Sequence, residues 1–197
     1  PDGTKFWVTS QFDGKVYAFS LSTAWDLSTA SYDSVNFSTT SQETEPYSTF
    51  FKPDGTKMYI VGAVNDTVYQ YSLSTAWNIS TASYDSISFT PTGSNNFELF
   101  FMGDGTKMYV SDYIAGIYEY NLSTAWDIST ASSNSSFDPT EETGLQTFYL
   151  TSDGSTLFVG GDTTDTIYKY TLSTPWSIST ASYTNESFSV LSQDGNP

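Results

Sequence analysis

The chain contains no cysteine, no histidine and no arginine. The first absence excludes disulfides and thiol nucleophiles, and the second excludes Ser-His-Asp triads and ordinary zinc sites. No run of 18 apolar residues occurs, so no segment is expected to cross a membrane as a helix. Carboxylates are therefore the only plausible catalytic side chains.

Positive charge is also scarce, because six lysines face 22 acidic residues and give a formal net charge of −16. Such a chain repels phosphate backbones, so we expect no nucleic-acid partner. Strong acidity is typical of secreted or halotolerant proteins, but a role in solubility alone is sufficient to explain it. The first residue is proline rather than methionine, which indicates a fragment or a processed product.

A single sequence unit recurs four times, and its tryptophans lie 52, 49 and 50 residues apart. Each tryptophan follows STA or STP and precedes a segment close to DISTAS. A period near 50 with alternating apolar residues is typical of an array of small β-sheets. The predicted repeats cover approximately residues 1–52, 53–102, 103–151 and 152–197 of one propeller domain.

Each repeat predicts four antiparallel strands and no helix. Around the second copy the predicted strands are Tyr47–Lys52, Lys57–Val61, Thr67–Tyr71 and Tyr84–Phe89. A PDGT turn separates the first two strands, and a longer STAWNISTAS loop precedes the last. The fold class predicted is all-β: a β-propeller of four-stranded antiparallel blades, about four of which are present.

The repeat also resembles known propeller families. The string PDGTKMYIV followed by VYQYSL resembles YVTN and WD40-like repeats, and the longer string through STAWNISTASYDS resembles repeats of large propeller proteins in marine bacteria and their phages. The resemblance covers almost the whole chain and implies a propeller architecture, without implying a chemistry. It departs from true WD40 repeats because no GH…WD pair is present.

The chain supplies four sets of the second, third and fourth strands but only three innermost strands. We therefore expect the ring to be incomplete: the protein continues on both sides, or copies combine into a larger ring. Closure as a four-bladed ring stays open as an alternative.

One edge of each predicted blade barely changes between copies. It carries the DGTK turn and the STAW loop, whose residues are predicted to be structural blade anchors. These anchors are Trp25, Trp77, Trp126, Trp176, Asp54, Gly55, Asp104 and Gly105. A tryptophan that binds a ligand is the alternative, but identical placement in every blade favours a latch between neighbouring blades.

The opposite edge varies in length and residue type, which is where a repeat scaffold builds a ligand surface. The candidate ligand-binding residues are Phe12, Asp13, Asn65, Asp66, Asp112, Tyr113, Asp162 and Asp165. Unselected drift in solvated loops explains the variation equally. Asp162 and Asp165 are also a weak calcium candidate, since the D-x-D-x-D-G pattern is missing; no other cofactor is expected.

The middle of the third strand holds Ala18, Gln70, Glu119 or Lys169. Because the charge at this position changes sign between blades, we expect it to face solvent or to lie between blades. The tyrosines on either side, such as Tyr69 and Tyr71, are expected in the core rather than on a sugar platform.

A glycosidase needs two carboxylates at a set separation, and no such pair recurs in this sequence. The sequence thus favours a non-enzymatic extracellular module for binding or adhesion. We expect it to be associated with a cell surface or a virion and to bind a protein or glycan partner. One alternative is a structural subunit that self-associates into a fibre, lattice or larger ring. The second alternative is a carboxylate-based hydrolase or lactonase-like propeller.

Overall fold

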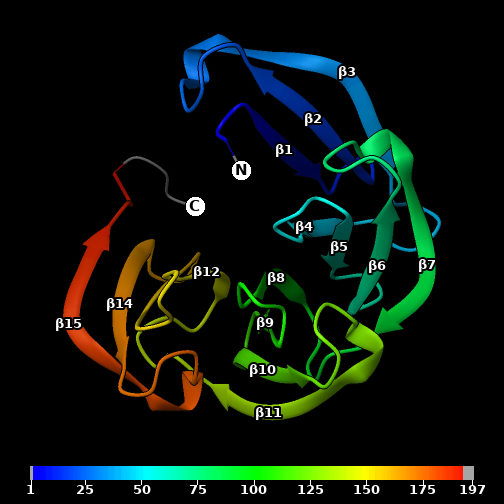
Figure 1. The fold of residues 1–197 in the computed structure, drawn as a ribbon. Helices are drawn as coiled ribbons and strands as arrows, with labels where there is room; N and C mark the ends of the chain where they lie inside the picture. Colours follow the sequence, from blue (N-terminus) through cyan, green and yellow to red (C-terminus); the bar gives the residue numbers. More distant parts are fainter. Residues whose placement is uncertain (1, 193–197) are drawn as a thin grey trace. The chain divides into compact units, whose positions relative to one another are not determined.

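The computed structural model describes residues 2–192 and is all-β (Figure 1). Within that range the chain forms four antiparallel sheets, the blades of a β-propeller. Three sheets have four strands and the first has three. Two compact units, Pro1–Ser88 and Phe89–Pro197, each contain two of these sheets.

The first unit begins with the three-stranded sheet, in the order β1-β2-β3. Its strands are β1 (Lys5–Ser10), β2 (Lys15–Leu21) and β3 (Ala30–Ser38). The second sheet of this unit runs β4-β5-β6-β7, and only the last residue of β7 lies beyond the unit. Its strands are β4 (Pro46–Phe51), β5 (Lys57–Gly62), β6 (Thr67–Leu73) and β7 (Ala82–Phe89).

The second unit repeats this order twice, as β8-β9-β10-β11 and β12-β13-β14-β15. The first of these sheets contains β8 (Asn96–Phe101), β9 (Lys107–Asp112), β10 (Gly116–Leu122) and β11 (Ala131–Phe137). The second contains β12 (Leu145–Leu150), β13 (Thr156–Gly161), β14 (Thr166–Leu172) and β15 (Ala181–Ser189). Among the described residues, β4, β8 and β12 each begin a four-stranded sheet. They are the three innermost strands that the sequence predicts.

A short 3-10 turn follows β2, β6, β10 and β14, the last strand but one of each sheet. The turns are η1 (Leu27–Thr29), η2 (Ile79–Thr81), η3 (Ile128–Thr130) and η4 (Ile178–Thr180). These turns are the ISTA part of the repeated loop, in which Asp26, Asn78 and Asp127 accept a hydrogen bond from the backbone two residues later. Among the described residues no helix is long and apolar enough to span a membrane.

Each unit buries its own apolar core between its two sheets. In the first unit Val16 of β2 packs with Met58, Ile60 and Tyr71 of the second sheet, all fully buried. In the second unit Tyr109 and Ile117 pack with Leu157 and Tyr170 of the neighbouring sheet. The alternation of apolar and polar residues along each strand produces this arrangement, since successive side chains point to opposite faces.

The residue in the middle of each third strand was expected to face solvent or to lie between blades. For the first three blades the solvent-facing alternative is wrong. Ala18, Gln70 and Glu119 are 6%, 2% and 0% exposed. In the second unit Glu119 accepts a hydrogen bond from the η4 segment of the next blade. Lys169 is half-buried, and its ammonium group pairs with Glu186.

Candidate functional site

The invariant edge of each blade is held by a contact between the DG turn and the repeated tryptophan. The backbone N–H of Trp77 donates to the carbonyl of Gly55 at 3.0 Å, and Trp126 donates to Gly105 at 3.0 Å. The same contact recurs in the other two blades, from Trp25 to Gly3 and from Trp176 to Gly154. Each indole ring covers its glycine so closely that a Cβ there would overlap the ring.

The aspartates of these turns stabilise the turn itself. Asp54 accepts hydrogen bonds from the N–H and hydroxyl of Thr56, and Asp104 accepts the same pair from Thr106. Lys52 also contacts Asp54, which lowers the pKa of that carboxyl group to about 2, together with the bonds from Thr56.

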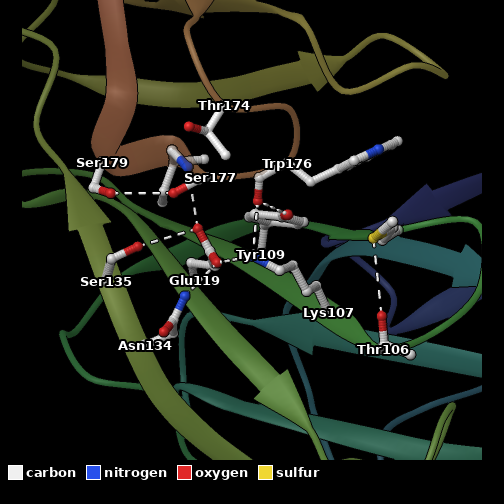
Figure 2. A network of polar contacts seen from close by, with 12 residues as sticks. Thr106, Lys107, Tyr109, Glu119, Asn134, Ser135, Thr174, Trp176, Ser177 and Ser179 are labelled. Atoms are coloured by element: carbon white, nitrogen blue, oxygen red, sulfur yellow. Dashed lines mark hydrogen bonds and ion pairs between the residues drawn. The ribbon is translucent and has the colours of Figure 1, made fainter.

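In the second unit the Trp176 loop also ties one blade to the preceding one (Figure 2). The carbonyl oxygen of Trp176 accepts hydrogen bonds from the hydroxyl of Tyr109 at 2.7 Å and from Nζ of Lys107 at 3.0 Å. The indole ring of Trp176 stacks on Phe100 with the ring centroids 6.4 Å apart. The loop therefore contacts three strand residues of the preceding sheet.

Glu119 is the centre of this network (Figure 2). Its carboxylate pairs with Lys107, and it accepts hydrogen bonds from Asn134, from Ser135 and from the backbone N–H of Ile178. Each contact satisfies a group that would otherwise be costly to bury. Since these contacts use the carboxylate fully and exclude water, Glu119 is a structural residue.

On the variable edge, one buried glutamate per unit stabilises a loop. Glu43 is fully buried and accepts hydrogen bonds from the backbone N–H groups of Glu45 and Asn65. Glu142 is 1% exposed and accepts the corresponding bonds from Gly144 and Thr164. Because both units contain the same arrangement, these two carboxylates belong to the scaffold.

A second carboxylate of the variable edge has no counterpart of this kind. Asp162 accepts a hydrogen bond on Oδ1 from the hydroxyl of Tyr113 at 2.8 Å and on Oδ2 from Nε2 of Gln146 at 2.8 Å. We call these three residues the Asp162 cluster. It joins the β9–β10 turn to the β13–β14 turn and to the innermost strand β12.

All three residues of the Asp162 cluster are half-buried. The hydrogen bond to Asp162 raises the pKa of the Tyr113 hydroxyl, because ionised tyrosine would face a carboxylate. Each carboxylate oxygen of Asp162 has one lone pair engaged by these contacts and one that can accept a proton from water. The cluster can therefore act as a general base supported by two donors.

Of the predicted ligand-binding residues, Tyr113 and Asp162 are joined by a hydrogen bond between turns of different blades. Asp112 is 3% exposed and accepts hydrogen bonds from the N–H groups of Ile114 and Ala115 in its own turn. Asp165 is 9% exposed and has a positive φ of 48°. Both residues shape the turns that carry Tyr113 and Asp162.

The candidates of the first unit are dispersed. Phe12 is 93% exposed, and Asp13 pairs with Tyr17 and with Lys15. Asn65 holds the loop before β4 through Glu43 and the carbonyl of Gln42. Asp66 has a positive φ of 48° in the β5–β6 turn. The sequence did not single out Gln146 as a candidate, although it ends the variable link 138–146, because nothing in that link marks its amide as a partner of another turn.

The calcium prediction stays a prediction. Both oxygens of Asp162 accept hydrogen bonds from protein groups. In the part of the chain that the structure describes, no group of three or more acidic side chains is placed to share a metal ion. A calcium ion at Asp162 and Asp165 would need further oxygen ligands from the backbone or from water.

No family model matches the chain, and no curated protein matches it by sequence. Solved structures do match it by fold. A candidate 6-phosphogluconolactonase from Bacteroides uniformis has a TM-score of 0.63 at 14% identity, over 93% of this chain and 54% of that one. A second candidate 6-phosphogluconolactonase, from Bacteroides fragilis, has a TM-score of 0.61 at 14% identity, over 96% and 53%.

The periplasmic gluconolactonase of Pseudomonas aeruginosa has a TM-score of 0.58 at 18% identity, over 96% of this chain and 55% of that one. The chain thus spans about half the length of these three structures. At this level of identity the likeness shows the propeller fold alone. No family model supports the resemblance to YVTN and WD40-like repeats or to marine and phage propellers, which stays a prediction.

These comparisons correct two predictions. The sequence favoured a non-enzymatic extracellular adhesion module. The three propeller structures described above are instead named as lactonases. The prediction that the chain is not an enzyme is contradicted by the same matches. That prediction rested on the absence of a carboxylate pair that recurs between repeats, whereas function resides in individual sites placed on a shared fold.

Proposed function

We propose that the chain is a lactonase-like propeller that hydrolyses a small sugar lactone with the Asp162 cluster. The proposal is supported chiefly by one observation: Asp162 is a half-buried residue whose carboxylate accepts one hydrogen bond on each oxygen, from Tyr113 and from Gln146. The likeness to lactonase propellers supports the reaction type. The buried scaffold carboxylate Glu142 is already used by backbone donors and takes no part.

In this reaction Asp162 removes a proton from a water molecule while the water oxygen attacks the lactone carbonyl carbon. The carbonyl oxygen becomes an oxyanion, and Tyr113 and Gln146 keep the Asp162 carboxylate oriented. When the intermediate collapses, the bond between the carbonyl carbon and the ring oxygen breaks. The ring oxygen then takes the proton from Asp162, and the product is a hydroxy acid.

The test compares two carboxylates on turns of the variable edge. Hydrolysis of D-glucono-1,5-lactone is followed at constant pH for the wild type, Asp162→Asn and Asp13→Asn. Removing the base should lower kcat by about 100-fold, whereas Asp13→Asn should leave kcat unchanged. Equal rates for all three proteins would exclude Asp162 as the base.

The predictions about location and partners remain proposals. A protein with a net charge of −16 is suited to a salt-rich surrounding, whether outside the cell or at its surface. Self-association is the alternative: among the described residues β1 pairs with a strand on one side, β2, and an open strand edge can pair with another chain. Sedimentation of the purified chain at several concentrations distinguishes a monomer from an assembly.

A further inference from the structure

Every cationic side chain of this protein is paired with an acidic one. The chain has six lysines and neither arginine nor histidine, and all six lie in the part of the chain that the structure describes. The six ion pairs are Lys5–Asp33, Lys15–Asp13, Lys52–Asp54, Lys57–Asp85, Lys107–Glu119 and Lys169–Glu186. None of these lysines can therefore bind an anionic group of a substrate without giving up a carboxylate partner.

The two lysines of the second unit also lie away from the Asp162 cluster. Lys107 begins β9 and Tyr113 follows the last residue of that strand, which separates their backbones by about 20 Å. Lys169 follows Asp165 along β14 at a backbone distance of roughly 13 Å. Charges this far apart are largely screened, because the Debye length in physiological salt is about 8 Å. Neither lysine therefore attracts an anion at the cluster.

Acidic side chains surround the cluster instead. Asp112 directly precedes Tyr113 and is 3% exposed, and Glu142 lies on the link before β12 and is 1% exposed. Glu142 reaches the turn that carries Asp162, since its carboxylate accepts hydrogen bonds from the N–H and the hydroxyl of Thr164. The pKa of the Tyr113 hydroxyl is raised by its hydrogen bond to Asp162, by desolvation and by the negative charges of Asp162 and Glu142. The electrostatic field at the cluster is therefore negative.

The cluster offers uncharged contacts to a substrate. The ring of Phe97, on the innermost strand β8, lies against the ring of Tyr113 with the centroids 5.7 Å apart. This pair of half-buried rings gives an apolar surface beside the carboxylate. The carboxamide of Gln146 has two N–H groups, and one of them donates to Asp162, so the other can donate to a hydroxyl group of the substrate. A lactone ring with hydroxyl groups and no charge suits these contacts.

We infer that the Asp162 cluster acts on uncharged sugar lactones and discriminates against lactones that carry a phosphate group. The inference rests on the proposed function, because it concerns the substrate of the same site. A phosphate monoester carries about −1.5 to −2 charges at neutral pH. Asp112, Glu142 and Asp162 repel it, and no unpaired cation compensates. The repulsion raises KM rather than lowering kcat, since it acts on binding and leaves the attack of water unchanged.

The kinetic test compares D-glucono-1,5-lactone with its 6-phosphate at constant pH. The phosphorylated lactone should have a KM about tenfold higher, with a similar kcat. Added sodium chloride should narrow this difference by screening the charges, while the KM of the uncharged lactone stays the same. Equal KM values, or a lower KM for the phosphorylated lactone, would overturn the inference. A difference that salt leaves unchanged would contradict discrimination by charge.

A matched pair of lysine variants places a new cation near the cluster or far from it. Thr143→Lys is near, because Thr143 is exposed and precedes Gly144, where a Cβ would lie 2.6 Å from Oδ1 of Asp162. Ser173→Lys is far, because Ser173 is exposed at the other end of β14. Thr143→Lys should lower the KM of the phosphorylated lactone about fivefold, whereas Ser173→Lys should leave it unchanged. Equal effects of the two variants would count against the inference.

A binding measurement keeps this inference separate from the proposed catalysis. If neither lactone is hydrolysed, the proposed function fails, and the preference is measured with two ligands that cannot react, 1,5-anhydro-D-glucitol and its 6-phosphate. In ¹H–¹⁵N NMR spectra of the whole chain, the carboxamide signal of Gln146 should shift saturably with the uncharged ligand, at about tenfold lower concentration than with the phosphorylated one. No shift with either ligand, or tighter binding of the phosphorylated one, would overturn the inference.

Discussion

The hydroxyl of Tyr113 donates a hydrogen bond to Oδ1 of Asp162 at 2.8 Å, across 49 positions of the sequence. The two residues occupy turns of neighbouring blades in the second unit, and Gln146 holds the other oxygen of the same carboxylate. Neither turn recurs in the other repeats with these residues. Because the repeat does not require this polar contact, we expect it to serve function rather than the scaffold.

Replacing Tyr113 by phenylalanine should lower kcat/KM for a sugar lactone by about tenfold, because a hydrogen bond to a charged group contributes about 1.5–3 kcal/mol. The fold should be unaffected, since Tyr113 is half-buried at a turn. In the wild type the pKa of Tyr113 is raised above 10, so its hydroxyl should remain a donor throughout the neutral range. Rates at pH 6–9 test this, and an undiminished rate in Tyr113→Phe would contradict it.

Replacing Glu119 by alanine should destabilise the second unit by about 3–5 kcal/mol, because Lys107 would lose its partner in a buried site. The N–H of Ile178 would lose its acceptor as well. Hydrogen exchange of the Ile178 amide and the thermal midpoint measure the two effects. Lys169→Ala, at the same strand position but half-exposed, should change the midpoint little; comparable losses in the two variants would contradict the account.

Gly105 has φ of +75°, and a Cβ there would overlap the ring of Trp126. Gly105→Ala should therefore lower stability by at least about 1 kcal/mol from backbone strain alone. Gly103 is the matched control two residues earlier in the same turn, where a Cβ would have no heavy atom within 4 Å. Unfolding in urea compares the two variants, and a loss in Gly103→Ala equal to that in Gly105→Ala would be unexpected.

Acid should weaken the DG turn of the second blade in a defined pH range. The pKa of Asp54 is about 2 in the folded chain against an ordinary value of 3.8, chiefly because of its contact with Lys52. A lowered folded pKa contributes stability above the ordinary value, and that contribution is lost as the pH falls toward 2. The urea midpoints of the wild type and Asp54→Asn should differ at pH 5 and converge near pH 2. A constant difference across this range would refute the assignment.

The repeat predicted the blades well, because the period near 50 and the strand alternation are local features. The DG turn and the tryptophan contacts follow from residues that recur in every copy, such as Gly55 and Trp77. Glu119 was harder to place, since a charged residue in an alternating strand normally indicates solvent exposure. Its burial depends on Lys107, Asn134 and Ser135, which are brought together only by the sheet.

The Asp162 cluster could be predicted only in part. Tyr113 and Asp162 were both candidates, because they lie in links that vary between repeats. Their contact depends on the packing of one blade beside another, which a single sequence does not reveal. Gln146 was missed because the alternation of its strand gives no sign that its amide reaches a turn of the same sheet.

The proposed catalysis of lactone hydrolysis by the Asp162 cluster can be checked on the unmodified chain by its rate of hydrolysis. Proton release from D-glucono-1,5-lactone is measured at constant pH with and without the protein, and with the Asp162→Asn variant as the reference. We expect saturable acceleration over buffer by the wild type and about a 100-fold smaller kcat for the variant. A wild-type rate equal to that of buffer, over a panel of sugar lactones, would contradict it.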